Sequence, residues 1–268
     1  MKSLWNHLGK KWSSYKFRFL PWVVFNMSEK TARPCTLAGE SVDKDQIMKS
    51  LEKIFQYFDQ YFCLKDDLTL YEQLHHNNQD ILRQVGGFSL ARAPSTVPEA
   101  GLGVFLSAGH AARGSVVCLY PGTVYQPYQP VLLQSLANQF IFRCVDGVHV
   151  DGSHSPISRA IFRSCVGRDQ VGMCRVGDTS WLTPRPVNPL NVGQFVNNEN
   201  SVHGANVRYQ EIDVPLDFPL HLRKFWGNIN FESSAVDGER QLRIVVLLAL
   251  RDIEEGEELF SSYFTVIR

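Results

Sequence analysis

The sequence predicts a mainly β domain with some α-helix, preceded by a helical segment. Two stretches before Gly87 repeat apolar residues every three or four positions, which is the period of an amphipathic helix. After Gly87 the chain changes to short β-rich runs that are separated by Gly, Pro and Asn. The longest apolar run, residues 244–250, fits a buried strand and falls far short of the roughly 20 residues that a membrane-spanning helix needs.

The bulk composition limits the class of partner. The chain has 268 residues, which is enough for one large domain or for one domain with an appendage. Basic and acidic residues balance at 27 each, so net charge gives no support to a nucleic-acid or histone-tail partner, and no nucleic acid is expected. The six cysteines contain no Cys-x-x-Cys pair and offer no zinc-site spacing. They are typical of reduced, mostly buried thiols of an intracellular protein.

Residues 1–28 form a basic, aromatic leader. They contain five basic residues and no acidic one, and one helical face carries Leu4, Trp5, Leu8, Trp12 and Tyr15. One interpretation is a helix that docks its aromatic face on the domain. The other is an organelle-targeting segment, or a helix that contacts a membrane surface or an import receptor. The choice between mitochondrion and nucleus or cytoplasm stays open with it.

Residues 29–87 predict a helical appendage. A linker with Pro and Gly as helix breakers comes first, and Ser41 or Asp43 can cap the helix that follows. A weaker second helical pattern ends at Gly86 and Gly87. The two apolar stripes consist of Ile47, Leu51, Ile54, Phe55, Phe58 and Phe62, and of Leu70, Tyr71, Leu74, Ile81, Leu82 and Val85. We expect these stripes to pack against the following domain, residues 88–268.

The β domain is predicted from its runs and turns. The expected strands are 116–120, 140–145, 148–150, 207–212 and 244–249. The Asp146–Gly147 pair suits a two-residue type I′ hairpin turn. Residues 152–190 are rich in Gly, Ser, Arg and Pro and predict a long irregular insertion. Loops of that length in compact domains are usually functional or disordered.

Three short motifs follow one another along the chain. They are Gly101-Leu102-Gly103, Asn197-Asn198, and a Gly-Glu-Glu-Leu segment at 256–259 that leads to Tyr263. Each alone is weak, because a Gly-x-Gly is usually a turn and an Asn pair usually a loop. In this order and spacing they resemble the SET domain of lysine methyltransferases over about residues 88–264.

The resemblance implies a SET-domain fold of small curved β-sheets with a C-terminal pseudoknot. The C-terminal segment would thread under the loop that contains Asn197-Asn198, which brings Asn197 close to Tyr263. The implied cofactor is S-adenosyl-L-methionine. Gly101 and Gly103 would let the backbone of Leu102 approach it. The Asn197 amide offers a donor and an acceptor to the zwitterionic end, and Asn198 or its backbone would meet the adenine.

The implied activity is methyl transfer to a lysine side chain of a protein substrate. Because this is an in-line displacement, the main task is to align a neutral amine with the methyl group. A narrow apolar channel lowers the lysine pKa from about 10.4 by desolvation. Tyr263 would orient the amine beside the cofactor, and Tyr120 would form another channel wall. Glu257 and Glu258 are expected in a turn, bonded to backbone or solvent, rather than as a general base.

Several positions depart from the SET pattern. Asn198 stands for the usual His, Gln194 for the usual Arg, and Ser261-Ser262 for a common aromatic-Asp pair. The aromatic position is a channel wall that influences how many methyl groups fit. Two rival functions therefore stay open: a catalytically silent SET module that binds proteins, and an organelle-associated adaptor whose leader carries the function. Cofactor binding separates the methyltransferase from both.

Overall fold

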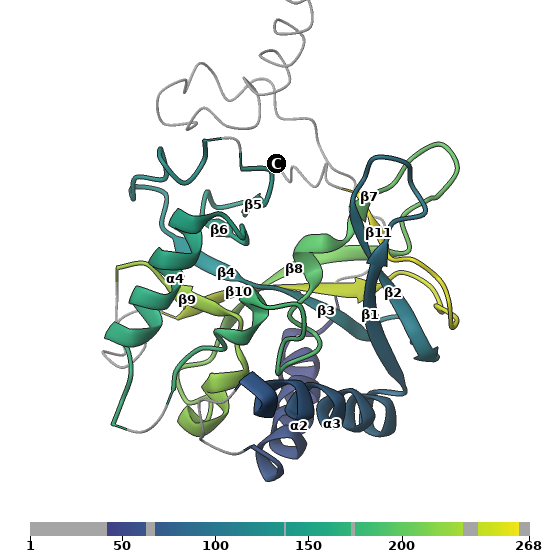
Figure 1. Ribbon diagram of the computed structural model, residues 1–268, viewed down its shortest axis with the longest axis horizontal. Helices are drawn as coiled ribbons and strands as arrows, with labels where there is room; N and C mark the ends of the chain where they lie inside the picture. Colours follow the sequence, from purple (N-terminus) through teal and green to yellow (C-terminus); the bar gives the residue numbers. More distant parts are fainter. Residues whose placement is uncertain (1–41, 63–67, 137, 173–174, 233–240, 263–268) are drawn as a thin grey trace, which may run out of the picture.

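Three β-sheets and a pair of helices make up most of the computed structural model, which describes residues 42–62, 68–136, 138–172, 175–232 and 241–262 (Figure 1). The leader, residues 1–28, lies outside the described residues, as does Tyr263. Within the part that the structure describes, no helix has the length and apolarity to cross a membrane.

Helices α2 (Lys44–Gln60) and α3 (Leu68–Gly86) lie together at one end of the molecule (Figure 1). Asp43 caps α2 by accepting a hydrogen bond from the backbone N–H of Asp45 at 3.2 Å, so the second of the two expected caps is the one used. Helix α3 ends at Gly86, and the next residue, Gly87, has a φ of +88°, the left-handed conformation that commonly follows a helix.

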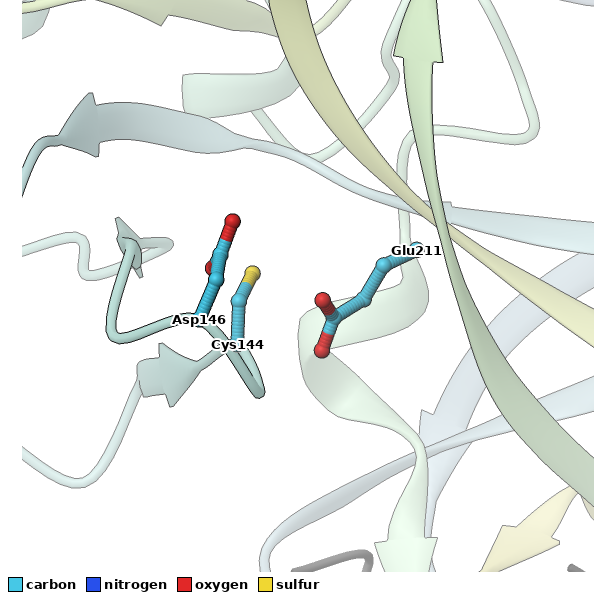
Figure 2. Close-up of side chains that lie close together, drawn as sticks. All are labelled: Cys144, Asp146 and Glu211. Carbon is cyan, nitrogen blue, oxygen red and sulfur yellow. The ribbon is translucent and has the colours of Figure 1, made fainter. Parts of the chain in front are cut away.

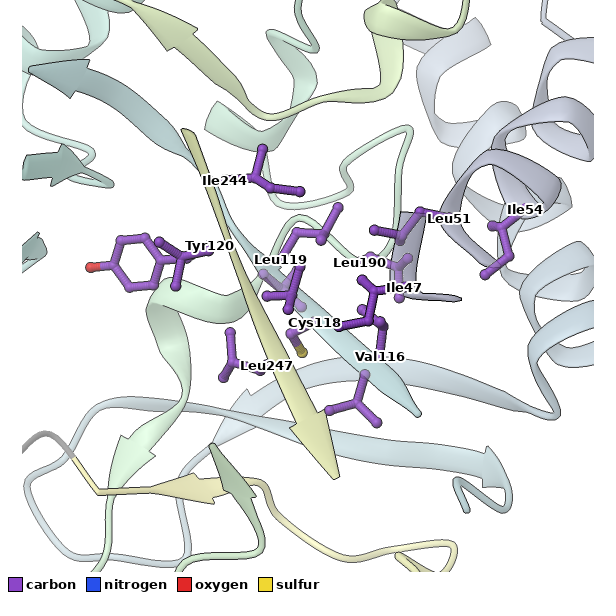
Figure 3. Packing of buried hydrophobic residues seen from close by; sticks show 14 of the residues in the cluster. Ile47, Leu51, Ile54, Val116, Cys118, Leu119, Tyr120, Leu190, Ile244 and Leu247 are labelled. Atoms are coloured by element: carbon purple, nitrogen blue, oxygen red, sulfur yellow. The ribbon is translucent and has the colours of Figure 1, made fainter. Parts of the chain in front are cut away.

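The apolar stripe of α2 is buried against the β domain, as the sequence predicts. Ile47, Leu51 and Ile54 belong to the same buried cluster as Leu119 and Leu190 (Figure 3). Further along the helix, the ring of Phe55 packs edge-on against Trp226 at a centroid distance of 4.8 Å. Truncating a buried Phe typically costs about 3–5 kcal/mol, so the helices contribute directly to the stability of the β domain.

The strands form three separate sheets. The first pairs β1 (Phe88–Pro94) with β2 (Leu102–Gly109). The second contains, in spatial order, β3 (Val116–Tyr120), β10 (Leu242–Ala249), β8 (Val207–Val214), β11 (Phe260–Ser261) and β7 (Asn197–Asn198). The third contains β5 (Ile141–Arg143), β6 (His149–Asp151), β4 (Gly122–Tyr125) and β9 (Asn228–Asn230). The unbroken apolar run in β10 follows from its position between β3 and β8, where residues 244–248 are fully buried.

The C-terminal strand β11 is threaded between two earlier segments. It runs parallel to β7, with Phe260 opposite Asn197 and Ser261 opposite Asn198, and it is also parallel to β8 at Val207. The side-chain amide of Asn206 holds the C-terminal segment in this position through two hydrogen bonds. It donates to the Glu258 carbonyl and accepts from the Phe260 N–H, both at 2.8 Å. This is the pseudoknot-like arrangement that the resemblance implies.

The expected type I′ turn at Asp146–Gly147 is wrong. A type I′ turn needs positive φ at both central residues, but of this pair only Gly147 has one, at +88°. The Gly147 N–H instead bonds the Cys144 carbonyl at 3.1 Å, and the Asp146 side chain accepts from the Val148 N–H at 3.2 Å. The central residues of the turn are therefore Val145 and Asp146, one position earlier than expected, and Gly147 follows them in a left-handed conformation.

The expected irregular insertion at 152–190 is also partly wrong, because it contains helix α4 (Pro156–Arg168). Ser155 caps this helix and Pro156 occupies its first turn, where a missing N–H costs nothing. Phe162, Cys165 and Val166 are buried at helical spacing. The Ser155-Pro156 pair is a typical helix start, and it was the sequence signal that could have predicted α4. Shorter 3₁₀ turns follow, at Ser180–Leu182, Gly193–Phe195 and Leu220–Phe225.

Candidate functional site

The two positions 101 and 103 of the Gly101-Leu102-Gly103 motif require glycine for different reasons. Gly101 precedes β2 with a φ of +78°, and nothing lies within 4 Å of the place where a Cβ would point. A Cβ on Gly103 would lie 2.1 Å from Oε1 of Glu258. Gly101 therefore supplies a left-handed backbone on an open side, whereas Gly103 makes room for a carboxylate from the C-terminal segment.

Asn197 joins the three sequence motifs at one point. Its Nδ2 donates to the backbone oxygen of Leu102 at 3.1 Å and to Oε1 of Glu258 at 3.2 Å. These two bonds use both N–H groups of the amide. Within the described residues its Oδ1 makes no hydrogen bond, so the amide presents an acceptor to a ligand and no donor.

Glu258 is buried and bonds side chains as well as one backbone N–H, so the expectation of a turn residue bonded to backbone or solvent is only partly right. Its carboxylate accepts from the Ser95 hydroxyl at 2.7 Å, the Thr96 N–H at 2.8 Å and the Thr96 hydroxyl at 2.5 Å, besides Asn197. Burial alone would raise the pKa of Glu258, but the hydrogen bonds from Thr96, Ser95 and Asn197 outweigh it and hold the pKa below its ordinary value. The group is therefore ionised at neutral pH.

The neighbouring Glu257 has different partners. It forms an exposed ion pair with Arg251 and accepts from the backbone N–H of Glu254 at 2.9 Å. The hydrogen bond with Arg251 lowers the pKa of Glu257. Glu257 therefore stabilises a turn at the surface, whereas Glu258 joins buried segments.

Asn198 pairs with the residue that follows Phe260, and Phe260 belongs to a ring pair that the sequence did not reveal. Asn198 is half-buried in β7, opposite Ser261 of the threaded strand. The ring of His203, in the loop after β7, stacks on the ring of Phe260 in β11, with centroids 4.9 Å apart and planes 9° apart. The contact exists only because β11 passes beside the loop after β7, so no local sequence signal could identify it. The expected adenine contact of Asn198 stays a prediction.

Tyr120 belongs to a buried group of rings, here called the aromatic cluster: Tyr120 of β3, Phe142 of β5 and Tyr209 of β8. The Tyr120 ring lies 5.5 Å from the Phe142 ring and 6.3 Å from the Tyr209 ring, and its hydroxyl donates to the Phe140 carbonyl at 2.9 Å. Phe142 and Tyr209 are 4.8 Å apart. Only Tyr120 could be identified from the sequence, because Phe142 and Tyr209 come from strands that are distant along the chain.

The aromatic cluster reaches the threaded strand through two hydroxyls. The Tyr209 and Ser261 hydroxyls are hydrogen-bonded at 3.1 Å, and both side chains are buried. Ser261 lies two residues before Tyr263 and opposite Asn198. The expected channel wall at Tyr120 is thereby connected to the strand that carries the C-terminal motif. The expected position of Tyr263 itself lies outside the described residues and stays a prediction.

Gln194, where the SET pattern usually has Arg, is 4% exposed, and its amide nitrogen and oxygen have no partner among the described residues. The position of its side chain is tight. A Cβ on Gly152 would lie 3.2 Å from the Gln194 Cβ and 3.0 Å from the Tyr120 ring. A buried amide without partners is unusual in a native protein. Gln194 therefore places a buried polar group close to Tyr120, on the other side of Gly152.

A separate acidic group comprises Cys144, Asp146 and Glu211, whose potential ligand atoms lie within 4.8 Å of one another (Figure 2). Arg243 neutralises it, with distances of 2.9 Å to Asp146, 3.3 Å to Glu211 and 2.6 Å to Asp213. Burial raises the pKa of the Cys144 thiol. These contacts fasten the hairpin between β5 and β6 to strands β8 and β10, which is a structural role.

Comparison with known proteins decides the family. The chain is 39% identical over 300 residues to SET domain-containing protein 9 of Homo sapiens, and the match covers 100% of this chain and 98% of the relative. The chain belongs to the SET domain-containing protein 9 family. The protein of the same name from Pongo abelii is 50% identical over 189 residues, which cover 70% of this chain and 68% of the relative. Membership confirms the resemblance to the SET domain and the mainly β SET fold.

Other comparisons are weaker. No family model matches the chain. Among solved structures, ctPRC2 in an autoinhibited conformation bound to S-adenosylmethionine is 14% identical with a TM-score of 0.36, covering 68% of this chain and 16% of that chain. KRYPTONITE in complex with mCHG DNA and SAH is 18% identical with a TM-score of 0.32, covering 66% and 23%. The family assignment therefore depends on the two sequence relatives.

Proposed function

We propose that this member of the SET domain-containing protein 9 family is an S-adenosylmethionine-dependent methyltransferase that modifies a lysine side chain of a protein. One observation carries the proposal. Asn197 contacts both Leu102 and Glu258, so the three motifs of the SET pattern meet at a single side chain.

The residues at this junction fit the amino-acid end of the cofactor. Oδ1 of Asn197 is an acceptor that has no partner among the described residues, which suits an ammonium group. The open side of Gly101 allows a ligand to approach the backbone closely. The bound cofactor supplies an electrophilic methyl group on sulfur. The protein then has to hold that group in line with the incoming amine.

The aromatic cluster provides the environment that a lysine amine needs in order to react. Tyr120 and Tyr209 are 6% and 8% exposed, so a side chain entering beside them loses most of its water. Desolvation disfavours the ammonium form and lowers the lysine pKa, which increases the fraction of neutral amine. Tyr263 is assigned, from the resemblance, to orient that amine toward the methyl group.

The test is methyl transfer by the purified chain. It is incubated with isotopically labelled S-adenosylmethionine and a cell lysate, and labelled methyl-lysine is identified by mass spectrometry. We expect label on lysine with the unsubstituted chain and none with Asn197→Ala. Cofactor binding without transfer to any lysine would instead support the silent protein-binding module. Absence of cofactor binding would overturn the proposed function.

A further inference from the structure

The Glu258 carboxylate lies where three segments meet, and each of its oxygens has its own donors. Oε1 accepts from the Ser95 hydroxyl and from Nδ2 of Asn197, at 2.7 and 3.2 Å. Oε2 accepts from the N–H and the hydroxyl of Thr96, at 2.8 and 2.5 Å. The loop before β2, strand β7 and the C-terminal segment are thereby held by one side chain.

The backbone around Glu258 is fixed as well. Its carbonyl accepts from the Asn206 side chain at 2.8 Å, and the next N–H, of Leu259, bonds the Val104 carbonyl at 2.8 Å. A Cβ on Gly103 would overlap Oε1, so the strand opposite is shaped to the carboxylate. Oε1 of Glu258 is therefore held in one position, and it restricts how the side-chain amide of Asn197 can be oriented.

The constraint falls on Asn197. With Oε1 of Glu258 and the carbonyl of Leu102 both on one side, only the NH₂ end of the amide can face inward. The Oδ1 end then faces outward. If the amide turned over, its oxygen would face an anionic oxygen and a carbonyl oxygen, and the outward group would become a donor.

We propose that Glu258 is a positioning residue for the cofactor: it fixes the orientation of the Asn197 amide, so that Oδ1 accepts from the cofactor's ammonium group. The inference rests on the proposed function and goes beyond it by assigning a role to a side chain that acts only through Asn197. Glu258 serves as a permanent acceptor, and its negative charge excludes the inverted amide.

Glutamine has nearly the same shape but cannot replace this arrangement. Its NH₂ must occupy the place of one of the two oxygens. On the Oε2 side it would oppose the Thr96 N–H, which cannot turn. On the Oε1 side the Ser95 hydroxyl can rotate and accept, so the NH₂ settles there and opposes the NH₂ of Asn197. We therefore expect Glu258→Gln to invert the Asn197 amide and present a donor to the ammonium group.

The experiment measures the dissociation constant of S-adenosylhomocysteine by isothermal titration calorimetry, which requires no turnover. Glu258→Gln should bind at least about tenfold more weakly, equal to about 1.4 kcal/mol. The matched control is Glu257→Gln, since Glu257 pairs with Arg251 at the surface, and its dissociation constant should stay within about twofold. The double variant Glu258→Gln with Asn197→Asp removes the repulsion between the two carboxylates, so it should bind more tightly than Asn197→Asp alone.

Each outcome has a defined meaning. Unchanged affinity in a folded Glu258→Gln sample overturns the inference, as does a double variant that binds no more tightly than Asn197→Asp alone. If Glu258→Gln does not fold, Asn197→Asp replaces it. A freely oriented aspartate would bind an ammonium group at least as well as asparagine, whereas repulsion from Glu258 predicts at least tenfold weaker binding. Failure of the unsubstituted chain to bind would instead overturn the proposed function itself.

Discussion

The side-chain amide of Asn197 donates to the backbone oxygen of Leu102 at 3.1 Å, across 95 residues of sequence. The C-terminal segment, whose strand β11 lies between β7 and β8, bonds the same amide through Glu258. Local sequence brings none of these groups together. The candidate cofactor site is thus a product of the threaded C-terminal segment.

Replacing Asn197 by Ala should remove cofactor binding and leave the fold intact, because the lost contacts lie at a half-buried rim. For the unsubstituted chain, S-adenosylhomocysteine at about 100 times its dissociation constant should add about 2.7 kcal/mol of stability, seen as a higher melting temperature. Asn197→Ala should show no such rise. Asn77→Ala, an exposed asparagine on α3, is the control and should keep the full shift. A full shift in Asn197→Ala would remove this residue from the site.

Arg243→Leu should lower the free energy of unfolding by about 2 kcal/mol, because it leaves Asp146, Glu211 and Asp213 facing one another without their cation. The loss stays below that of a fully buried pair, since Asp146 and Asp213 are 49% and 41% exposed. Chemical denaturation measures it.

Arg251→Leu is the control for the Arg243 substitution. It breaks one surface pair with Glu257 and should cost less than about 1 kcal/mol. Equal losses in the two variants would contradict the structural role of the Arg243 network.

The two helices before Gly87 and all five expected strands are present, for a physical reason, whereas the other strands of the described structure were not predicted. The stripe of α2 and the apolar run of β10 are set by local periodicity, and burial follows from it. The turn at Asp146 was mispredicted because turn geometry depends on hydrogen bonds that residue type alone does not fix, whereas helix α4 was missed although Ser155 and Pro156 form a typical helix start. The partners of Glu258 and the Tyr209–Ser261 pair could not be predicted, since they depend on threading between distant segments.

Stability should fall as the pH drops from about 7 toward 5. Burial, aided by nearby arginines, lowers the pKa of His149 and of His154 to about 4, whereas an unfolded histidine titrates near 6.5. Between these values the unfolded chain binds more protons than the folded one, so the unfolding free energy decreases on acidification, by up to about 1.4 kcal/mol per pH unit for each group. Denaturant unfolding at pH 7 and pH 5 measures the change.

His154→Gln and His149→Gln serve as tests of that pH dependence. Each substitution removes one titrating group, so each should flatten the stability profile between pH 7 and 5. The same slope in both variants and the unsubstituted chain would assign the pH dependence to other groups.

Residues 1–40, fused to a fluorescent protein, should direct it to mitochondria if the basic leader is a targeting segment. The prediction follows from five basic and no acidic residues before Glu29. Diffuse fluorescence would favour the docking helix instead. In that case the aromatic residues of the leader should be protected from solvent in the full-length protein.

Tyr263→Phe should slow methyl transfer tenfold or more, each tenfold being about 1.4 kcal/mol of barrier, because it removes the hydroxyl assigned to the amine and keeps the ring. Cofactor affinity should change little. Single-turnover rates are needed, since slow product release could hide the loss. An unchanged single-turnover rate would exclude Tyr263 from catalysis and favour a silent binding module.

The most direct test of the central claim is a calorimetric titration of the purified, full-length chain with S-adenosylhomocysteine. If the junction of Leu102, Asn197 and Glu258 is a cofactor site, the titration gives saturable binding with one ligand per chain, and Asn197→Ala abolishes the heat. No binding at millimolar ligand, with a sample shown to be folded, would contradict the account.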